Sequence, residues 1–181
     1  FGLYFWYTCD RSASISDGVA AFDAAWDAKP PLAAYPLPQH QSLSSDPDFE
    51  GSKDITYHML KLYCDGSHSV PAALSPMSSS ACPLDYRMSW LLYGPLRRAG
   101  VPRLPVRVEE GLHTSFASQL EAVGLWHYAV FVLLHIENSD MRVWAVCETL
   151  NRNCRHTTHL AEENEKRAFV IDRLGVPEVC I

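Results

Sequence analysis

The chain has 181 residues, of which 48% are hydrophobic and 20% are charged, and its formal net charge is −6 at pH 7. These values are ordinary for a globular protein, so they exclude extensive disorder and predict a single domain over residues 1–181. The 15 basic residues are outnumbered by 21 acidic ones, which argues against nucleic acid as a partner. No apolar run reaches the roughly 18–20 residues that a membrane-spanning helix needs.

The cysteines and the first residue bear on the cellular compartment. Six cysteines fit either a reduced protein or one in an oxidising compartment. The start at Phe1 rather than Met, the scattered cysteines and the few lysines favour a secreted or extracytoplasmic protein, with a cytoplasmic location as the alternative. The cysteines are Cys9, Cys64, Cys82, Cys147, Cys154 and Cys180.

The first half of the chain alternates predicted elements with a long connection. Residues 1–9, FGLYFWYTC, predict a strand, and residues 15–28 predict a helix capped by Ser16. Residues 29–51 are rich in proline and predict a long surface loop, of the kind that often serves as a lid or binding loop. Residues 54–64 predict a core helix, because one helical face carries Ile55, Met59 and Leu62.

A helix that begins at Cys82 is the most informative prediction in the second half. Three serines at 78–80 can cap it, and Pro83 is tolerated in a first turn. The helix should close with Arg97, Arg98 and Gly100, and Pro95 should kink it or end its regular part.

Strands dominate the prediction for the rest of the chain. The apolar runs at 103–108, 126–136 and 141–150 predict strands, and the turn residues at 138–140 predict a hairpin between the last two. A short helix over 115–123, an acidic helix over 158–166 and an edge strand at 168–172 complete the predicted elements.

This order of elements predicts an activated thiol. Cys82 at a helix N-terminus is favoured as thiolate, because the positive end of the helix dipole lowers a thiol pKa. His127 opens the next long strand and can act as base, while Glu148 on the strand after it can orient the imidazole. Asn151 and Asp140 are alternative orienting groups for His127.

These residues resemble the transglutaminase-like cysteine enzymes, which have a papain-like fold. The likeness covers residues 78–151 and rests on Cys82, Asp85 and Tyr86, on the LRRAGVP segment at 96–102, on His127, and on Glu148 four residues after Trp144. Asp85 and Tyr86 fall one position later than the family spacing. The resemblance implies an α+β fold in which a central antiparallel sheet packs against the helix that presents Cys82.

The implied activity is cysteine-dependent acyl transfer on an amide, with Cys82, His127 and Glu148 as the catalytic residues. The reaction would be that of a peptidase, an amidase or deamidase, or a transglutaminase, acting on a protein or peptide through a thioester. The resemblance implies a cysteine hydrolase or acyltransferase, and it implies no cofactor.

Two alternatives belong to other classes of protein. In the first, the chain is a secreted, disulfide-stabilised binding or effector protein in which Cys82 is bridged. In the second, a zinc ion stabilises the domain, because thiolate and imidazole are the ligands that zinc prefers. The candidate zinc ligands are Cys147, Cys154, His156 and His159.

Overall fold

The computed structural model describes residues 13–27, 53–80, 82–154 and 161–177, and every regular element in these ranges is helical. The predicted α+β fold with a central antiparallel sheet is therefore wrong. The described residues belong to two compact units, Phe1–Leu104 and Pro105–Ile181, and the prediction of a single domain stays a prediction. The strand predicted at 1–9 and the loop predicted at 29–51 lie outside the described residues.

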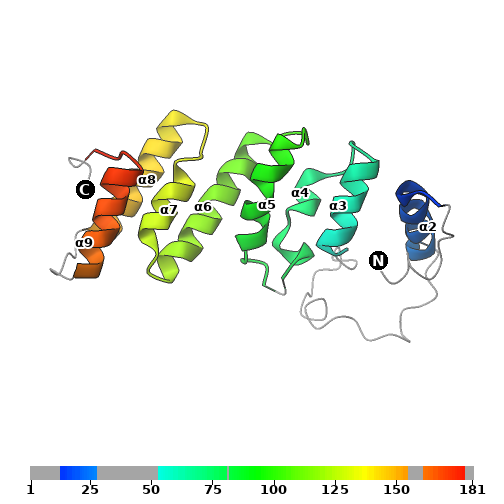
Figure 1. Ribbon diagram of the computed structural model, residues 1–181, viewed down its shortest axis with the longest axis horizontal. Helices are drawn as coiled ribbons and strands as arrows, with labels where there is room; N and C mark the ends of the chain where they lie inside the picture. The colour runs from blue at the N-terminus through cyan, green and yellow to red at the C-terminus, as the bar shows by residue number, and fades with distance from the viewer. Residues whose placement is uncertain (1–12, 28–52, 81, 155–160, 178–181) are drawn as a thin grey trace. The chain divides into compact units, whose positions relative to one another are not determined.

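The first unit contains four α-helices and one short 3₁₀ turn among its described residues. Helix α2 packs on α3, α3 packs on α4, and α5 contacts the 3₁₀ turn η2 (Figure 1). The helices predicted over 15–28 and 54–64 are confirmed as α2 and α3. The elements are α2 (Ile15–Asp27), α3 (Ile55–Cys64), α4 (Val70–Ala73), η2 (Pro76–Ser78) and α5 (Arg87–Arg98).

Helix α2 is capped two residues earlier than its sequence suggests. The Ser14 Oγ accepts a hydrogen bond from the Asp17 amide at 3.1 Å, and the Asp17 carboxylate accepts one from the Ser14 amide at 3.1 Å. This reciprocal pair satisfies two amides near the helix start, as in a capping box. Ser14 caps the helix, so the prediction of Ser16 is wrong.

A partly buried ionic cluster joins α2 to α3. The Asp23 carboxylate accepts hydrogen bonds from Tyr57 Oη at 2.6 Å and Lys53 Nζ at 3.0 Å, and it also pairs with Lys61. Burial of the carboxylate raises its pKa, but the bonds from Lys61, Tyr57 and Lys53 outweigh burial and lower the pKa of Asp23 to about 2. The packing of α2 on α3 therefore depends on charge as well as on apolar contact.

Helix α5 begins later than predicted and ends where predicted. Its first residue is Arg87, and it runs through Pro95 to Arg98. Gly100 has a φ of 87°, a left-handed conformation that suits glycine just past a helix end. The predicted closing residues Arg97, Arg98 and Gly100 are confirmed.

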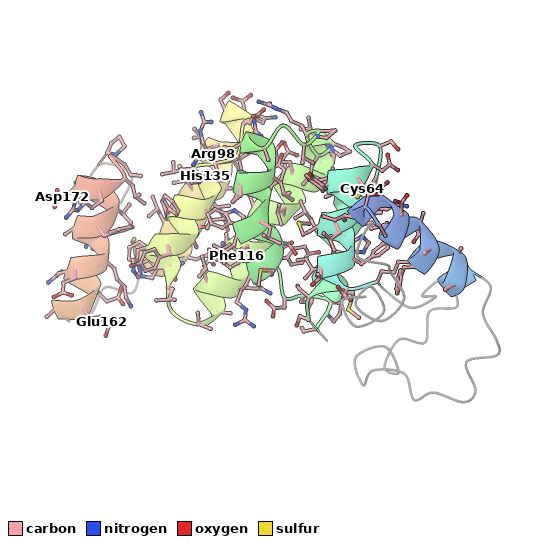
Figure 2. The ribbon with its side chains drawn as sticks, turned by 45° about the vertical axis from the view of Figure 1, so that its right-hand side comes forward. Cys64, Arg98, Phe116, His135, Glu162 and Asp172 are labelled. Carbon is pink, nitrogen blue, oxygen red and sulfur yellow. The ribbon has the colours of Figure 1, made fainter. Side chains whose placement is uncertain are left out.

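The second unit is a set of helices around α7. Helix α7 packs against α6, α8 and the π-helical turn η3, which continues α9 (Figure 1). Figure 2 shows Glu162 and Asp172 at opposite ends of the α9–η3 segment. The elements are α6 (Val106–Ala122), α7 (Trp126–Leu133), α8 (Ser139–Cys154), α9 (Ala161–Ala168) and η3 (Phe169–Arg173).

The strands predicted in this unit are all wrong. Residues 126–136 form α7 and its C-terminal turn, and residues 141–150 lie within α8. Residues 103–108 lead into α6, which also absorbs the short helix predicted over 115–123, and residues 168–172 belong to the end of α9 and to η3. The acidic helix predicted over 158–166 overlaps α9.

The predicted hairpin turn at 138–140 is instead a helix start. The Asn138 side-chain oxygen accepts hydrogen bonds from the amides of Asp140 at 3.0 Å and Met141 at 3.2 Å. A short polar side chain that accepts from the next amides is typical of a helix N-cap. The same residue types favour turns and caps, so the sequence pattern alone did not separate the two.

Candidate functional site

Cys82 lies in the loop before α5 and not at the start of a helix. Its side chain is exposed, and its amide donates to Ser80 Oγ at 3.2 Å. The first helical residue, Arg87, follows five positions later, so the dipole argument for a thiolate has no structural basis here. Among the described residues, Cys64, Cys82 and Cys147 are not bridged in disulfides.

His127 is a buried residue near the start of α7. Its ring lies 4.3 Å from that of Tyr128 and packs edge-on against Phe169 at 5.5 Å. Burial lowers the pKa of His127, and the positive charge of Lys166 lowers it further. These contacts hold η3 against α7, which is a packing function.

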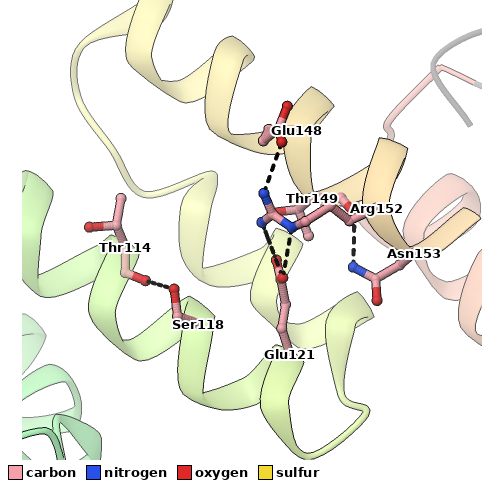
Figure 3. Close-up of polar contacts among 7 residues, drawn as sticks. All are labelled: Thr114, Ser118, Glu121, Glu148, Thr149, Arg152 and Asn153. Carbon is pink, nitrogen blue, oxygen red and sulfur yellow. Dashed lines mark hydrogen bonds and ion pairs between the residues drawn. The ribbon is translucent and has the colours of Figure 1, made fainter.

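Glu148 lies on α8 with about half of its side chain exposed, and it accepts a hydrogen bond from Arg152 Nη1 at 3.2 Å. Arg152 also donates to Glu121 through Nε at 3.2 Å and Nη2 at 2.9 Å, so its fork joins α8 to α6 (Figure 3). Within the described residues, Glu148 and His127 do not contact each other. The catalytic assignment of Cys82, His127 and Glu148 stays a prediction, without the imidazole–carboxylate pair that a triad requires.

The alternative zinc ligands are only partly described. Cys147 and Cys154 lie seven positions apart on α8, and burial raises the pKa of the Cys154 thiol. His156 and His159 lie outside the described residues. Among the residues that are described, no three His, Cys, Asp or Glu side chains are grouped to hold a metal ion.

The second unit contains a cavity of about 200 Å³ between α8 and the segment that follows η3. Most of its lining is apolar, the exceptions being Arg142 and the Cys147 thiol. The lining residues are Leu134, Arg142, Val143, Val146, Cys147, Leu174, Gly175, Val176 and Pro177. Sequence reasoning missed this cavity because its lining comes from three segments that only the helical fold brings together.

Arg142 is held in place at this cavity by the connection between α7 and α8. Its Nη1 donates to the carbonyl of Ile136 at 2.8 Å and to that of Glu137 at 3.5 Å. Within the described residues its Nε and Nη2 have no hydrogen-bond or ion-pair partner. Since a guanidinium fork matches a carboxylate, these groups form an acceptor-binding edge on an apolar cavity.

Large apolar side chains are exposed on the helices of both units. On α5, Met88 is 45% exposed and Leu91 is 58% exposed, and their spacing of three positions places them along one exposed stripe of the helix. Leu84, in the turn before α5, is 69% exposed. On α8, Val143 and Trp144 are 60% and 61% exposed. Apolar side chains exposed in groups, rather than singly, are typical of surfaces that bind other proteins.

Charge is also unevenly distributed along the chain. Residues 86–108 contain five of the 15 basic residues and none of the 21 acidic residues, in a chain whose formal net charge is −6. This segment includes α5 and the connection to α6. Two of its arginines are paired with carboxylates just outside the segment, Arg87 with Asp85 at 2.7 Å and Arg107 with Glu110 at 3.7 Å.

The geometry of the described residues thus defines an all-helical protein whose surface features are suited to binding rather than to thiol chemistry. No described helix is both long enough and apolar enough to cross a bilayer.

The sequence matches the family described as Nuclear protein 96 (Nup96) over residues 1–181, and the chain belongs to that family. It is 35% identical over 175 residues to the nuclear pore complex protein Nup98-Nup96 of Drosophila melanogaster, a match that covers 97% of this chain and 9% of the relative. It is 31% identical over 171 residues to nucleoporin nup189 of Schizosaccharomyces pombe, covering 86% of this chain and 9% of the relative. The chain therefore spans about a tenth of the length of these relatives.

This family membership corrects the functional predictions. The resemblance to transglutaminase-like enzymes is wrong, and so are cysteine-dependent acyl transfer and the alternative of a secreted disulfide-stabilised effector. The secreted location is also wrong, because the relatives are nuclear pore complex proteins. The segment LRRAGVP misled because arginines in a last helical turn, followed by glycine, are suited to ending many helices.

Proposed function

We propose that this chain is a protein-binding, non-catalytic part of a nuclear pore complex component. The match to the Nuclear protein 96 family over the whole chain is the observation that carries the proposal. Two features of the described residues support it: an all-helical architecture and apolar side chains exposed in groups on α5 and α8. Such surfaces gain free energy when another protein covers them.

The location of the chain in cells tests this proposal directly. The chain, fused to a fluorescent protein and expressed in cultured animal cells, should form a nuclear rim that coincides with a pore marker. A rim signal that coincides with the pore marker is the result expected if the chain binds other proteins of the pore. Diffuse fluorescence from a folded fusion would contradict the proposal.

A matched pair of substitutions tests whether the α5 stripe contributes to that binding. Leu91→Glu places a charge in the exposed stripe of α5, and Val123→Glu places one on a valine that is 69% exposed beyond α6. Both substitutions should change the free energy of unfolding by less than about 0.5 kcal/mol, because surface substitutions rarely have a larger effect. Leu91→Glu should weaken the rim signal, whereas Val123→Glu should retain it. Equal effects of the two variants would show that the stripe is not a binding surface.

A further inference from the structure

The cavity beside α8 has the size and lining of a side-chain pocket. An apolar cavity of about 150 Å³ is enough to hold a benzene ring. The cavity here measures about 200 Å³ and is lined by Leu134, Val146, Leu174 and Val176, among others. It therefore suits one aromatic or large aliphatic side chain, whose transfer from water would be favourable.

Arg142 adds a charge preference at the same place. Two carbonyls in the connection between α7 and α8 fix its Nη1, which removes much of the freedom that a surface arginine loses on binding. Within the described part of the chain no carboxylate pairs with its remaining N–H groups. An occupant that carries a carboxylate next to its apolar group would satisfy both halves of this surface.

We infer that this cavity binds a short peptide segment of a partner protein, in which a large apolar side chain lies next to an aspartate or glutamate. The apolar side chain enters the cavity between Val146 and Leu174, and the carboxylate pairs with Arg142. The exposed Val143 and Trp144 extend the contact along α8. The inference rests on the proposed function for the claim that the occupant is a protein, and it specifies the chemistry of that partner.

A peptide selection on the purified full chain tests the inference. A phage library of random seven-residue peptides should yield sequences with Leu, Ile, Met or Phe within two positions of Asp or Glu. The selected peptide, labelled with fluorescein, is then measured by anisotropy, alongside a version in which Gln or Asn replaces the acid. That replacement should weaken binding about tenfold, the effect of losing one charged hydrogen-bond pair. Selected peptides that lack acids, or that bind equally well without them, would overturn the inference.

Substitutions at the cavity locate the binding. Val143→Asp places a negative charge at an exposed position of the lining and should weaken binding about tenfold, while Val123→Asp, an exposed valine outside the lining, should leave it within twofold. The Arg142→Glu variant should no longer bind the acidic peptide and should instead bind a version in which Lys replaces the acid. An unfolded variant could not show this gain of binding. Equal binding by the Val143→Asp and Val123→Asp variants would place the peptide elsewhere and overturn the inference.

Two further measurements distinguish a peptide bound in the cavity from a peptide bound elsewhere and from a bound lipid. Bound peptide should slow the reaction of N-ethylmaleimide with Cys147, which lines the cavity, and leave the exposed Cys82 unaffected. Anionic phosphatidylserine vesicles should not compete with the peptide, and competition that Val143→Asp abolishes would indicate a lipid site instead. A nuclear-rim signal without peptide binding would refute the cavity inference alone, whereas peptide binding without a rim signal would refute the proposed function alone.

Discussion

Asp23→Asn tests whether charge holds α2 against α3. The carboxylate receives bonds from Lys53, Tyr57 and Lys61, and its pKa falls from 3.8 to about 2. A fall in pKa of about 1.8 corresponds to roughly 2.4 kcal/mol, at about 1.36 kcal/mol for each pH unit, which is an upper bound on what the ionised form contributes. Because 22% of the side chain remains exposed, screening reduces this figure, and we expect Asp23→Asn to cost about 1–2 kcal/mol.

The lowered pKa of Asp23 determines how the stability should change with pH. The contribution is fully present above the unfolded value of 3.8 and is lost as the pH falls towards about 2. Urea unfolding of the chain between pH 7 and pH 2, with hydrogen exchange of the α2 amides as a local measure, checks both points. The wild type should lose protection of α2 over this acid range, and Asp23→Asn should show that loss already at pH 7.

Asp172→Asn provides the control, because Asp172 is an exposed carboxylate on η3 and should change stability by less than about 0.5 kcal/mol. If Asp23→Asn costs no more than this control, or if α2 keeps its protection, apolar packing rather than the ionic cluster holds α2, and the reasoning is refuted.

Three further predictions concern a helix cap, the core and a histidine pair. Ser14→Ala should lower the stability of α2 by about 1 kcal/mol, seen as faster exchange of its first amides; unchanged exchange would exclude the cap. Leu150→Ala should cost about 2–5 kcal/mol in urea unfolding, because Leu150 is 1% exposed, and a loss below about 1 kcal/mol would show that the second unit collapses around the gap. Nδ1 of His58 lies 2.9 Å from Nε2 of His68, and burial lowers the pKa of both histidines. The stability that their neutral forms provide is therefore present above about pH 6.5 and is lost as the pH falls through their lower folded pKa values. His68→Gln should therefore flatten the fall in unfolding free energy between pH 7 and pH 5, and an unchanged slope would contradict this account.

The helices of the first unit were predictable because their apolar residues recur at helical spacing and polar residues mark their ends. Val19 on α2 and Leu62 on α3 are buried as that spacing requires. Ile55 and Met59 of the predicted face are only partly buried, however, and α3 buries Tyr57 and His58 instead. At the end of α5, Gly100 has the left-handed backbone that its position just past the helix suggests. Local chemistry was sufficient for these elements.

The helices of the second unit were not predictable by the same reasoning. Helix α7 contacts three other elements, so its apolar residues cover most of its circumference, and a short apolar run without clear periodicity fits a buried strand equally well. Its valines and aromatic residues, such as Val130 and Trp126, also favour strands. In α8 the buried residues are Ala145, Val146, Thr149 and Leu150, which is a helical spacing that the alternating run RVWAVCE concealed.

The candidate site was less predictable than the fold, because its chemistry depends on which segments meet. Cys82, His127 and Glu148 could form an activated thiol only if His127 and Glu148 lay on paired strands. Nothing in the sequence around Arg142 indicates that two carbonyls hold it beside a cavity. A likeness of order and spacing among a few reactive residues has little weight unless the elements that carry them are correct.

The bonds from Arg142 to the carbonyls of Ile136 and Glu137 tie one side chain to the corner between α7 and α8. A carboxylate of a bound partner that paired with the same guanidinium would therefore be connected to that corner. A partner bound in this way would be connected to the main chain and not only to a flexible surface side chain.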